Sequence, residues 1–220
     1  HMLEHLMFKG SKDFNKQNGK LVWKVLGPKG AELNATTWFD RTNYYEMLPS
    51  EYLEDAMAIE ADRMRNALLR QEDRDAEMTV VRNEYERGEN DPHEALEKAI
   101  WGQAYQVHPY HYSTIGLRED IEGMTMERLK WFYDLFYWPN NATVSVIGDF
   151  DREIAFDLLE KHFGRHGRSP EAMPSAYVQE PEQKEPRRVT VRRAGEIGIV
   201  GVAHKLPHGL DPDMVSLQVL

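Results

Sequence analysis

The sequence predicts an α+β fold in which a largely antiparallel sheet packs against helices. The first observation is a pair of runs rich in Thr, Tyr and Trp, 31–38 and 41–48, which flank Phe39-Asp40 and are typical of a β-hairpin. The second is a series of segments in the middle of the chain whose apolar residues recur at helical spacing. The third is a set of further β-prone runs in the second half of the chain.

Each remaining element has a local signal of its own. The first residues read as a short helix, and Gly27-Pro28 ends a second one. Thr125 and Asp151 are N-cap residue types, and Pro92 stands early in its helix, where its missing N–H costs nothing. Helices are expected over 20–26, 50–70, 72–88, 91–104, 125–137 and 151–163, with another from 213, and later strands over 143–148, 188–193 and 197–203.

A change of composition divides the chain. Residues 169–187 are charged and interrupted by proline, which is typical of a linker. We therefore expect a domain over 1–168, a linker over 169–187 and a further, incomplete segment over 188–220. That last segment either begins a second homologous domain or supplies the closing strands of the first.

Composition excludes several classes of function. A net charge of −10 argues against nucleic acid as a partner, and no apolar run reaches the roughly 18 residues of a membrane span. The absence of cysteine excludes disulfides, thiol catalysis and Cys-based zinc sites, which leaves His, Asp and Glu as metal ligands. Cysteine usage fits both cytoplasm and periplasm, and we slightly favour the periplasm.

The opening residues contain His-x-x-Glu-His, the inverted zinc-peptidase signature. On a helix, His1 and His5 project from one face and could bind one ion, while Glu4 lies beside it and could take a proton from a zinc-bound water. A surface helix with two solvated histidines is the alternative, and His-Met could also be a cloning remnant. Two histidines cannot hold a catalytic zinc, so a third ligand is required.

The helix expected over 72–88 offers candidates for that ligand. Glu77 and Glu84 are seven positions apart, so two turns place them on one face, whereas Glu86 lies on another. One of the pair could bind the metal and the other could support a ligand from behind. Charges on a solvated helix would give the same pattern, so periodicity alone does not select a ligand.

The chain closely resembles the pitrilysin family of zinc metallopeptidases, known as M16, which includes insulysin and the mitochondrial processing peptidases. The resemblance covers nearly the whole chain in the right order. It is carried by His1-x-x-Glu4-His5, Gly30-Ala31-Glu32-Leu33-Asn34-Ala35-x-Thr37, Tyr44-Tyr45, Leu48-Pro49, Glu77-x-x-Val80-Val81-x-x-Glu84, His108-Pro109-Tyr110, Ile115-Gly116, Tyr137-x-Pro139-x-Asn141-Ala142 and Gly148-Asp149.

The resemblance implies a LuxS/MPP-like metallohydrolase fold and one Zn²⁺ per site, held by His1, His5 and Glu84. Glu4 would be the general base, and Glu77 would be the supporting glutamate of the same helix as Glu84. Because the interval from His5 to Glu84 is slightly longer than is usual in the family, Glu86 stays open as an alternative ligand.

Further implications concern the substrate and the rest of the protein. Asn34 and Ala35 would lie on an edge strand that pairs with the backbone of a peptide or unfolded segment. His1 would be native, with the first strands of its domain missing before it. A second homologous half, in the same polypeptide or in a separate subunit, would supply an Arg/Tyr pair to the transition state.

Two alternatives compete with a zinc endopeptidase. One is a non-catalytic relative that keeps the fold as a scaffold or partner subunit, and the other is a metal-binding module without hydrolysis. Glu4 beside two histidines favours the enzyme, since neither alternative needs a general base. The seven remaining histidines are expected to be loop or surface residues: His93, His108, His111, His162, His166, His204 and His208.

Overall fold

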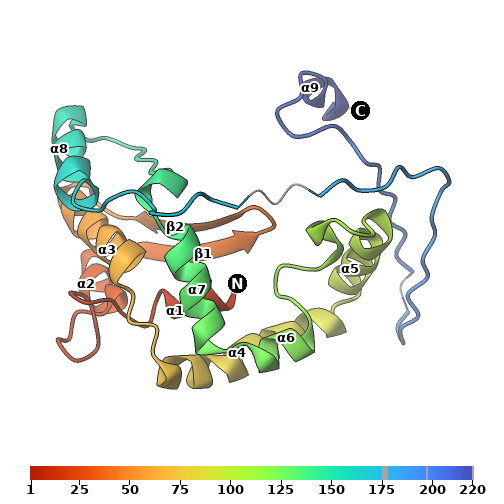
Figure 1. The fold of residues 1–220 in the computed structure, drawn as a ribbon, viewed down its shortest axis with the longest axis horizontal. Helices are drawn as coiled ribbons and strands as arrows, with labels where there is room; N and C mark the ends of the chain where they lie inside the picture. Colours follow the sequence, from red (N-terminus) through yellow and green to blue (C-terminus); the bar gives the residue numbers. More distant parts are fainter. Residues whose placement is uncertain (175–177, 197, 220) are drawn as a thin grey trace. The chain divides into compact units, whose positions relative to one another are not determined.

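The structure is a computed structural model that describes residues 1–174, 178–196 and 198–219. The chain forms two compact units, each assembled from two stretches of sequence. The first unit comprises His1–Tyr85 and Thr114–Ala176, and the second comprises Glu86–Ser113 and Tyr177–Leu220. Figure 1 colours the chain from its N-terminus to its C-terminus and labels the elements.

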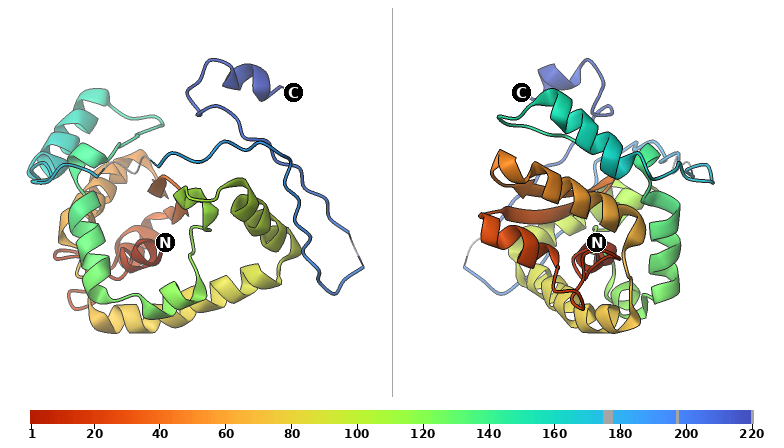
Figure 2. Two further views of the ribbon diagram at one scale, coloured as in Figure 1. Left: turned by 45° about the vertical axis from the view of Figure 1, so that its right-hand side comes forward. Right: turned by 90° about the vertical axis from the view of Figure 1, so that its left-hand side faces the viewer.

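The first helix, α1 (Met2–Leu6), is the centre of the first unit. Its apolar side chains are buried in a cluster that includes Val81 of the long helix α4 (Gln71–Asn90) and Leu129 of α7 (Met126–Phe136). On another side α1 contacts strand β1 (Glu32–Trp38), as Figures 1 and 2 show. Burial on several sides therefore fixes a five-residue helix that would be marginal by itself.

The predicted hairpin is confirmed. Strand β1 (Glu32–Trp38) pairs antiparallel with β2 (Arg41–Met47), in a register that sets Ala35 opposite Tyr44 and Thr37 opposite Thr42. The side chains alternate between the two faces, and the buried face carries Leu33 and Ala35. The same face therefore directs Thr37 toward the interior.

A second cluster packs against the same buried face of the hairpin. It joins Leu33 to Val22 and Leu26 of α2 (Val22–Leu26) and to Ile59 of α3 (Leu53–Asn66). Helix α8 (Arg152–Phe163) packs against α3 (Figure 2). Short 3₁₀ turns flank these helices at Gly27–Lys29, Ser50–Tyr52 and Pro139–Asn141.

Two predicted helix ends were wrong. The helix expected to reach 70 ends at Asn66, because the Leu68 amide donates to the Gly10 carbonyl at 3.0 Å and Leu69 has a φ of 41°. The helix expected to stop at Gly88 continues, and α4 runs over Gln71–Asn90. Gly88 allows a close approach instead, since a Cβ there would meet the carboxylate of Glu94.

Other helices agree with the sequence more closely. Thr125 caps α7 by accepting from the Arg128 amide at 3.3 Å, and Asp151 accepts from two amides at the start of α8. Helix α6 (Arg118–Gly123) had no sequence signal and was not predicted. In the second unit, Asp91 caps α5 (Pro92–Ala104), a 3₁₀ turn follows at Pro109–His111, and α9 covers Met214–Leu217.

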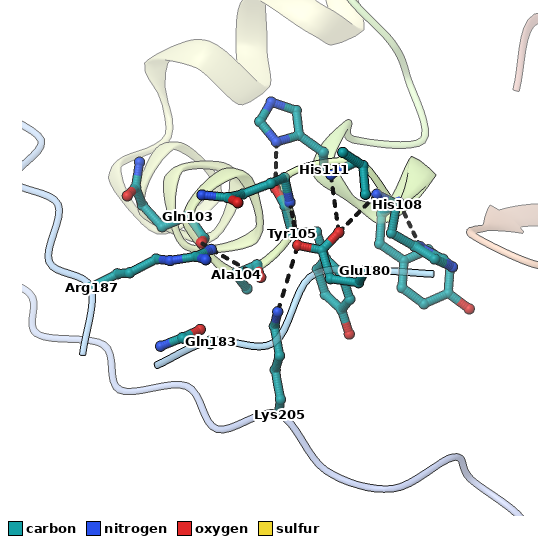
Figure 3. A network of polar contacts seen from close by, with 12 residues as sticks. Gln103, Ala104, Tyr105, His108, His111, Glu180, Gln183, Arg187 and Lys205 are labelled. Atoms are coloured by element: carbon teal, nitrogen blue, oxygen red, sulfur yellow. Dashed lines mark hydrogen bonds and ion pairs between the residues drawn. The ribbon is translucent and has the colours of Figure 1, made fainter. Parts of the chain in front are cut away.

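A carboxylate organises part of the second unit (Figure 3). Glu180 accepts from the backbone amides of Gln106, Val107 and His108 at 2.7–3.0 Å, and the Lys205 ammonium lies 3.8 Å away. These contacts fasten the segment around Glu180 to the loop that follows α5.

The later strands were not observed. Residues 143–148, 188–193 and the described part of 197–203 form no ladder, and residue 197 itself lies outside the described residues. A strand needs a neighbour for its backbone groups, and across 1–174, 178–196 and 198–219 the sheet contains β1 and β2 alone. The α+β class is confirmed, with a smaller sheet than expected. Among these residues no helix has the length and apolar character to cross a membrane.

Candidate metal centre

The two histidines of the opening motif face one another. Helix α1 places them one turn apart, and their ring centroids are 4.7 Å from each other. Both side chains are largely enclosed, at 13% exposure for His1 and 19% for His5. Neighbouring apolar residues of α1 are buried, so the imidazoles are held on a rigid helix rather than on a mobile end.

Helix α4 brings Glu84 to both imidazoles. Its Oε1 lies 3.6 Å from Nε2 of His1, and its Oε2 lies 3.4 Å from Nε2 of His5. Two donors bound to zinc at about 2.0–2.1 Å and at the tetrahedral angle stand about 3.4 Å apart. Each imidazole Nε2 therefore lies about as far from an oxygen of Glu84 as two ligands of one tetrahedral ion lie from each other. Both contacts belong to Glu84, which favours it over Glu86 as the third donor.

Glu77, two turns earlier on α4, supports His5 from behind. Its Oε1 lies 2.8 Å from Nδ1 of His5, which leaves Nε2 of that ring directed at Glu84. Its other oxygen forms an ion pair with Lys9. Burial acts to raise the pKa of Glu77, but the hydrogen bonds from Lys9 and His5 outweigh it and lower the pKa. Glu77 is thus a carboxylate anion behind the imidazole.

The two histidines have different electrostatic surroundings. Hydrogen bonding to Glu84 raises the pKa of His5, burial opposes the change, and Glu77 adds to it. His1 differs, because its Nδ1 is buried and has no hydrogen-bond partner among the described residues. An imidazole whose Nε2 faces a carboxylate and a second imidazole fits a metal-ligand role. The residues present therefore fit a zinc ion.

Glu4 lies within the same group but is held differently. Ligand atoms of His1, Glu4 and His5 are all within 4.8 Å of one another, so proximity alone would also allow Glu4 as a ligand. However, Glu4 is buried, and its Oε2 accepts a hydrogen bond from the Thr37 hydroxyl. A carboxylate engaged on one oxygen, beside the donors, is placed to act on a group bound there.

Asn34 and Ala35 lie on β1 as expected, but on opposite faces. Asn34 is exposed and Ala35 is buried. The Oδ1 of Asn34 accepts from the Ala35 amide at 2.9 Å, so this N–H is directed away from β2 and toward the other edge of the strand. A backbone donor is thus available at the edge once the Asn34 side chain moves.

Two supporting features were missed at the level of sequence. One is Lys9, to which the sequence assigns no role. The other is a buried cluster in which Arg63 pairs with Glu60 and, at 3.2 Å, with Glu46 of β2. Burial and hydrogen bonding to Glu60 raise the pKa of Glu46 to about 9. Only the alternation of β2 hinted that Glu46 faces inward.

Several of the remaining histidines have structural partners. Nδ1 of His108 accepts from the Tyr110 amide at 3.2 Å, and Nδ1 of His111 lies 2.6 Å from the Tyr105 carbonyl. His162 lies on α8 rather than in a loop and contacts the Glu54 carboxylate at 3.2 Å. His166 lies 2.8 Å from the Ala61 carbonyl. Within the described part of the chain, none of the seven remaining histidines belongs to a group of three or more His or acidic ligand atoms close enough to hold a metal.

Two family models match the chain. The model of insulinase, peptidase family M16, matches residues 1–117, and the model described as the peptidase M16 inactive domain matches residues 123–220. The chain belongs to peptidase family M16, a family of zinc proteases, and the predicted resemblance is confirmed.

Individual relatives extend the comparison. The chain is 34% identical over 223 residues to the zinc protease PqqE of Helicobacter pylori, covering 100% of this chain and 50% of that protein. It is 30% identical over 164 residues to a probable mitochondrial-processing peptidase subunit beta of Schizosaccharomyces pombe, covering 74% and 36%. The chain therefore spans about half, or less, of the relatives that it matches.

Solved structures confirm the fold. The crystal structure of a protease from Helicobacter pylori superposes with a TM-score of 0.77 at 34% identity, over 82% of this chain and 44% of that one. The first half of the periplasmic protease PqqL from Escherichia coli gives a TM-score of 0.69 at 26% identity, over 80% and 38%.

Proposed function

We propose that the protein containing this chain is a zinc endopeptidase that hydrolyses peptides or unfolded segments. The observation that carries the proposal is the meeting of His1, His5 and Glu84 at 3.4–3.6 Å, with the buried carboxylate of Glu4 beside them. Family membership supports protease activity in general. The geometry supports the assignment of individual residues.

Three residues would hold the ion and one would act as the base. His1 and His5 bind through Nε2, and Glu84 binds through its carboxylate. When bound, zinc supplies a Lewis acid that lowers the pKa of a water molecule to about 7 and polarises a peptide carbonyl. Glu4 accepts a proton from the attacking water and returns it to the leaving amine. Glu77 keeps the imidazole of His5 in the tautomer and orientation that binding requires.

The substrate would add to the sheet along β1. An extended peptide pairs through its backbone with an edge strand, which gives affinity with little demand on side-chain sequence. The hydrogen bond from the Ala35 amide to Asn34 supports this placement, because it marks a backbone donor directed at the edge. In the bound state the Asn34 side chain would release the Ala35 amide and become free to contact the peptide.

A second M16-like half would complete the active site, in the same polypeptide or as a separate subunit. The chain covers 50% of the Helicobacter pylori relative, which supports this inference. In that arrangement 1–220 binds zinc but cleaves poorly without the other half. We infer a periplasmic location in preference to the cytoplasm, because a similar protease is described as periplasmic.

The test is the Glu4→Gln variant of the complete protein. A carboxamide at this position cannot take a proton, so cleavage of unfolded, fluorescein-labelled casein should fall by at least about 100-fold. Zinc content, measured by atomic absorption, should stay at the wild-type level. Glu127→Gln, at an exposed position of α7, is the matched control and should cleave normally. Wild-type turnover by Glu4→Gln would remove Glu4 from the mechanism, and an inactive wild type with bound zinc would favour the non-catalytic scaffold.

A further inference from the structure

The hydroxyl of Thr37 contacts the carboxylate proposed as the general base. Thr37 lies on the inner face of β1, and its Oγ1 donates to Oε2 of Glu4. The two residues are 33 positions apart, and the strand contacts α1 at this point. An ionised carboxylate can only accept hydrogen bonds, so the direction of this one is fixed by its chemistry.

A second hydroxyl lies behind Thr37. Oγ1 of Thr42, directly across the hairpin, is 3.3 Å from Oγ1 of Thr37. The hydroxyls of Thr37 and Thr42 therefore form a short row behind the carboxylate of Glu4.

The carboxylate gives this row a single direction. Each hydroxyl has one proton to donate and can accept at the same time. Because Thr37 gives its proton to Glu4, its oxygen is open to the proton of Thr42. The O–H of Thr42 can then point toward Thr37 while the O–H of Thr37 points toward Glu4, so that one bond polarises the other.

We infer that Thr37 is a positioning residue for Glu4, and that the hydroxyl of Thr42 behind it supports it in that role. The inference rests on the proposed function. Thr37 fixes Oε2 of the Glu4 carboxylate and leaves Oε1 for the water. The contact also fixes the plane of the carboxylate, and therefore the direction from which Glu4 accepts the proton. Thr37 itself touches neither the substrate nor the ion.

The experiment compares Thr37→Val with Thr37→Ser in the complete protein. Valine keeps the shape of threonine without its hydroxyl, whereas serine keeps the hydroxyl. The substrate is an internally quenched fluorescent peptide whose sequence surrounds a casein bond that the wild type cleaves. On this peptide, Thr37→Val should lower kcat by about 10- to 100-fold, which is the expected effect of losing a hydrogen bond to a charged group. KM should change by less than about 2-fold, and Thr37→Ser should recover most of kcat.

Controls separate positioning from folding. Thr143→Val makes the same substitution at an exposed position outside the hairpin and should leave kcat unchanged. Thr42→Val should give a smaller loss than Thr37→Val, since it breaks the row one bond further from Glu4. Melting temperature and zinc affinity, measured by competition with a chromogenic chelator, should match the wild type in all of these variants.

A crystal structure tests the positioning of Glu4 directly, without a measurement of activity. In crystals of the metal-free protein, Glu4 should leave its single position in Thr37→Val and keep it in Thr37→Ser. The inference is overturned if Glu4 stays in place in Thr37→Val, if Thr37→Val and Thr37→Ser lose equal activity, or if zinc affinity falls in parallel with kcat. Failure of the proposed function looks different, because Glu4→Gln would then cleave as the wild type does, while the crystals would still report on Thr37.

Discussion

The carboxylate of Glu77 lies 2.8 Å from Nδ1 of His5, although 72 positions separate the two residues in the chain. This contact leaves the other ring nitrogen of His5 facing Glu84. Helix α4 therefore supplies both Glu77, which supports the ring, and Glu84, which faces it. The imidazole is thereby oriented before any ion arrives.

Removing the support should weaken the metal site without abolishing it. Replacing Glu77 by Ala leaves His5 free to rotate, so zinc affinity should fall by about 10- to 100-fold. Zinc affinity should fall less in Glu77→Gln, because the carbonyl of glutamine still accepts the hydrogen bond from His5. Competition with a chromogenic chelator measures the change. Lys9→Met should show a smaller loss in the same direction. Unchanged affinity in Glu77→Ala would mean that packing alone orients the ring.

The third ligand can be decided by a matched pair of variants. Glu84→Gln removes the carboxylate that lies 3.4–3.6 Å from both imidazoles and should lose zinc by at least about 100-fold in affinity. Glu86→Gln makes the same change two residues later and should bind zinc normally. Isothermal titration of the metal-free protein distinguishes them, and the reverse result would move the ligand to Glu86.

The buried Arg63 cluster predicts a dependence of stability on pH. Glu46 has its pKa raised from 4.5 to about 9, so between these values the folded chain holds a proton that the unfolded chain releases. The contribution is fully present below pH 4.5 and is lost as pH rises through about 9. Glu46→Gln stays neutral at every pH, so its melting temperature at about pH 8.5 should exceed that of the wild type by about 2–4 °C or more. Equal slopes between about pH 5 and pH 8.5 would exclude this explanation.

The Glu180 contacts in Figure 3 predict the opposite pH dependence. Partial burial acts to raise the pKa of Glu180, but the amides of Val107, His108 and Gln106 outweigh it and lower the pKa to about 2. The anchoring is fully present above the ordinary value of 4.5 and is lost as pH falls toward 2. Hydrogen exchange should show faster exchange of these three amides in Glu180→Gln at neutral pH. Identical protection would mean that other contacts hold the loop.

The parts of the site that the sequence predicted are those with local signals. The spacing from His1 to His5 needs only a helix, and the hairpin needs only two β-prone runs and a turn. Glu77 and Glu84 share a face by helical period, but period cannot tell which carboxylate meets a histidine. The contacts of Lys9 and Thr37 join residues from different elements, so nothing near either residue in the chain signals them.

The strands and helix ends that failed depend on neighbours. A run such as 143–148 has β propensity, but propensity forms a strand only when another backbone pairs with it. Leu69 has a φ of 41° because contacts with the residues around Gly10 redirect the chain, and no residue type at that point marks the turn. Gly88 lies inside a helix, where its missing side chain leaves room for the carboxylate of Glu94.

Strand β1 contacts the proposed base and also forms the edge proposed to bind the substrate. Its inner face presents Thr37 to Glu4, while two residues earlier the Ala35 amide is directed at the edge where a peptide would attach. A peptide that adds to the sheet at this edge would make β1 more rigid, and β1 is the strand that positions Glu4. Peptide binding and proton transfer would then be coupled. Proteins whose strands are already paired in a folded sheet would be poor substrates.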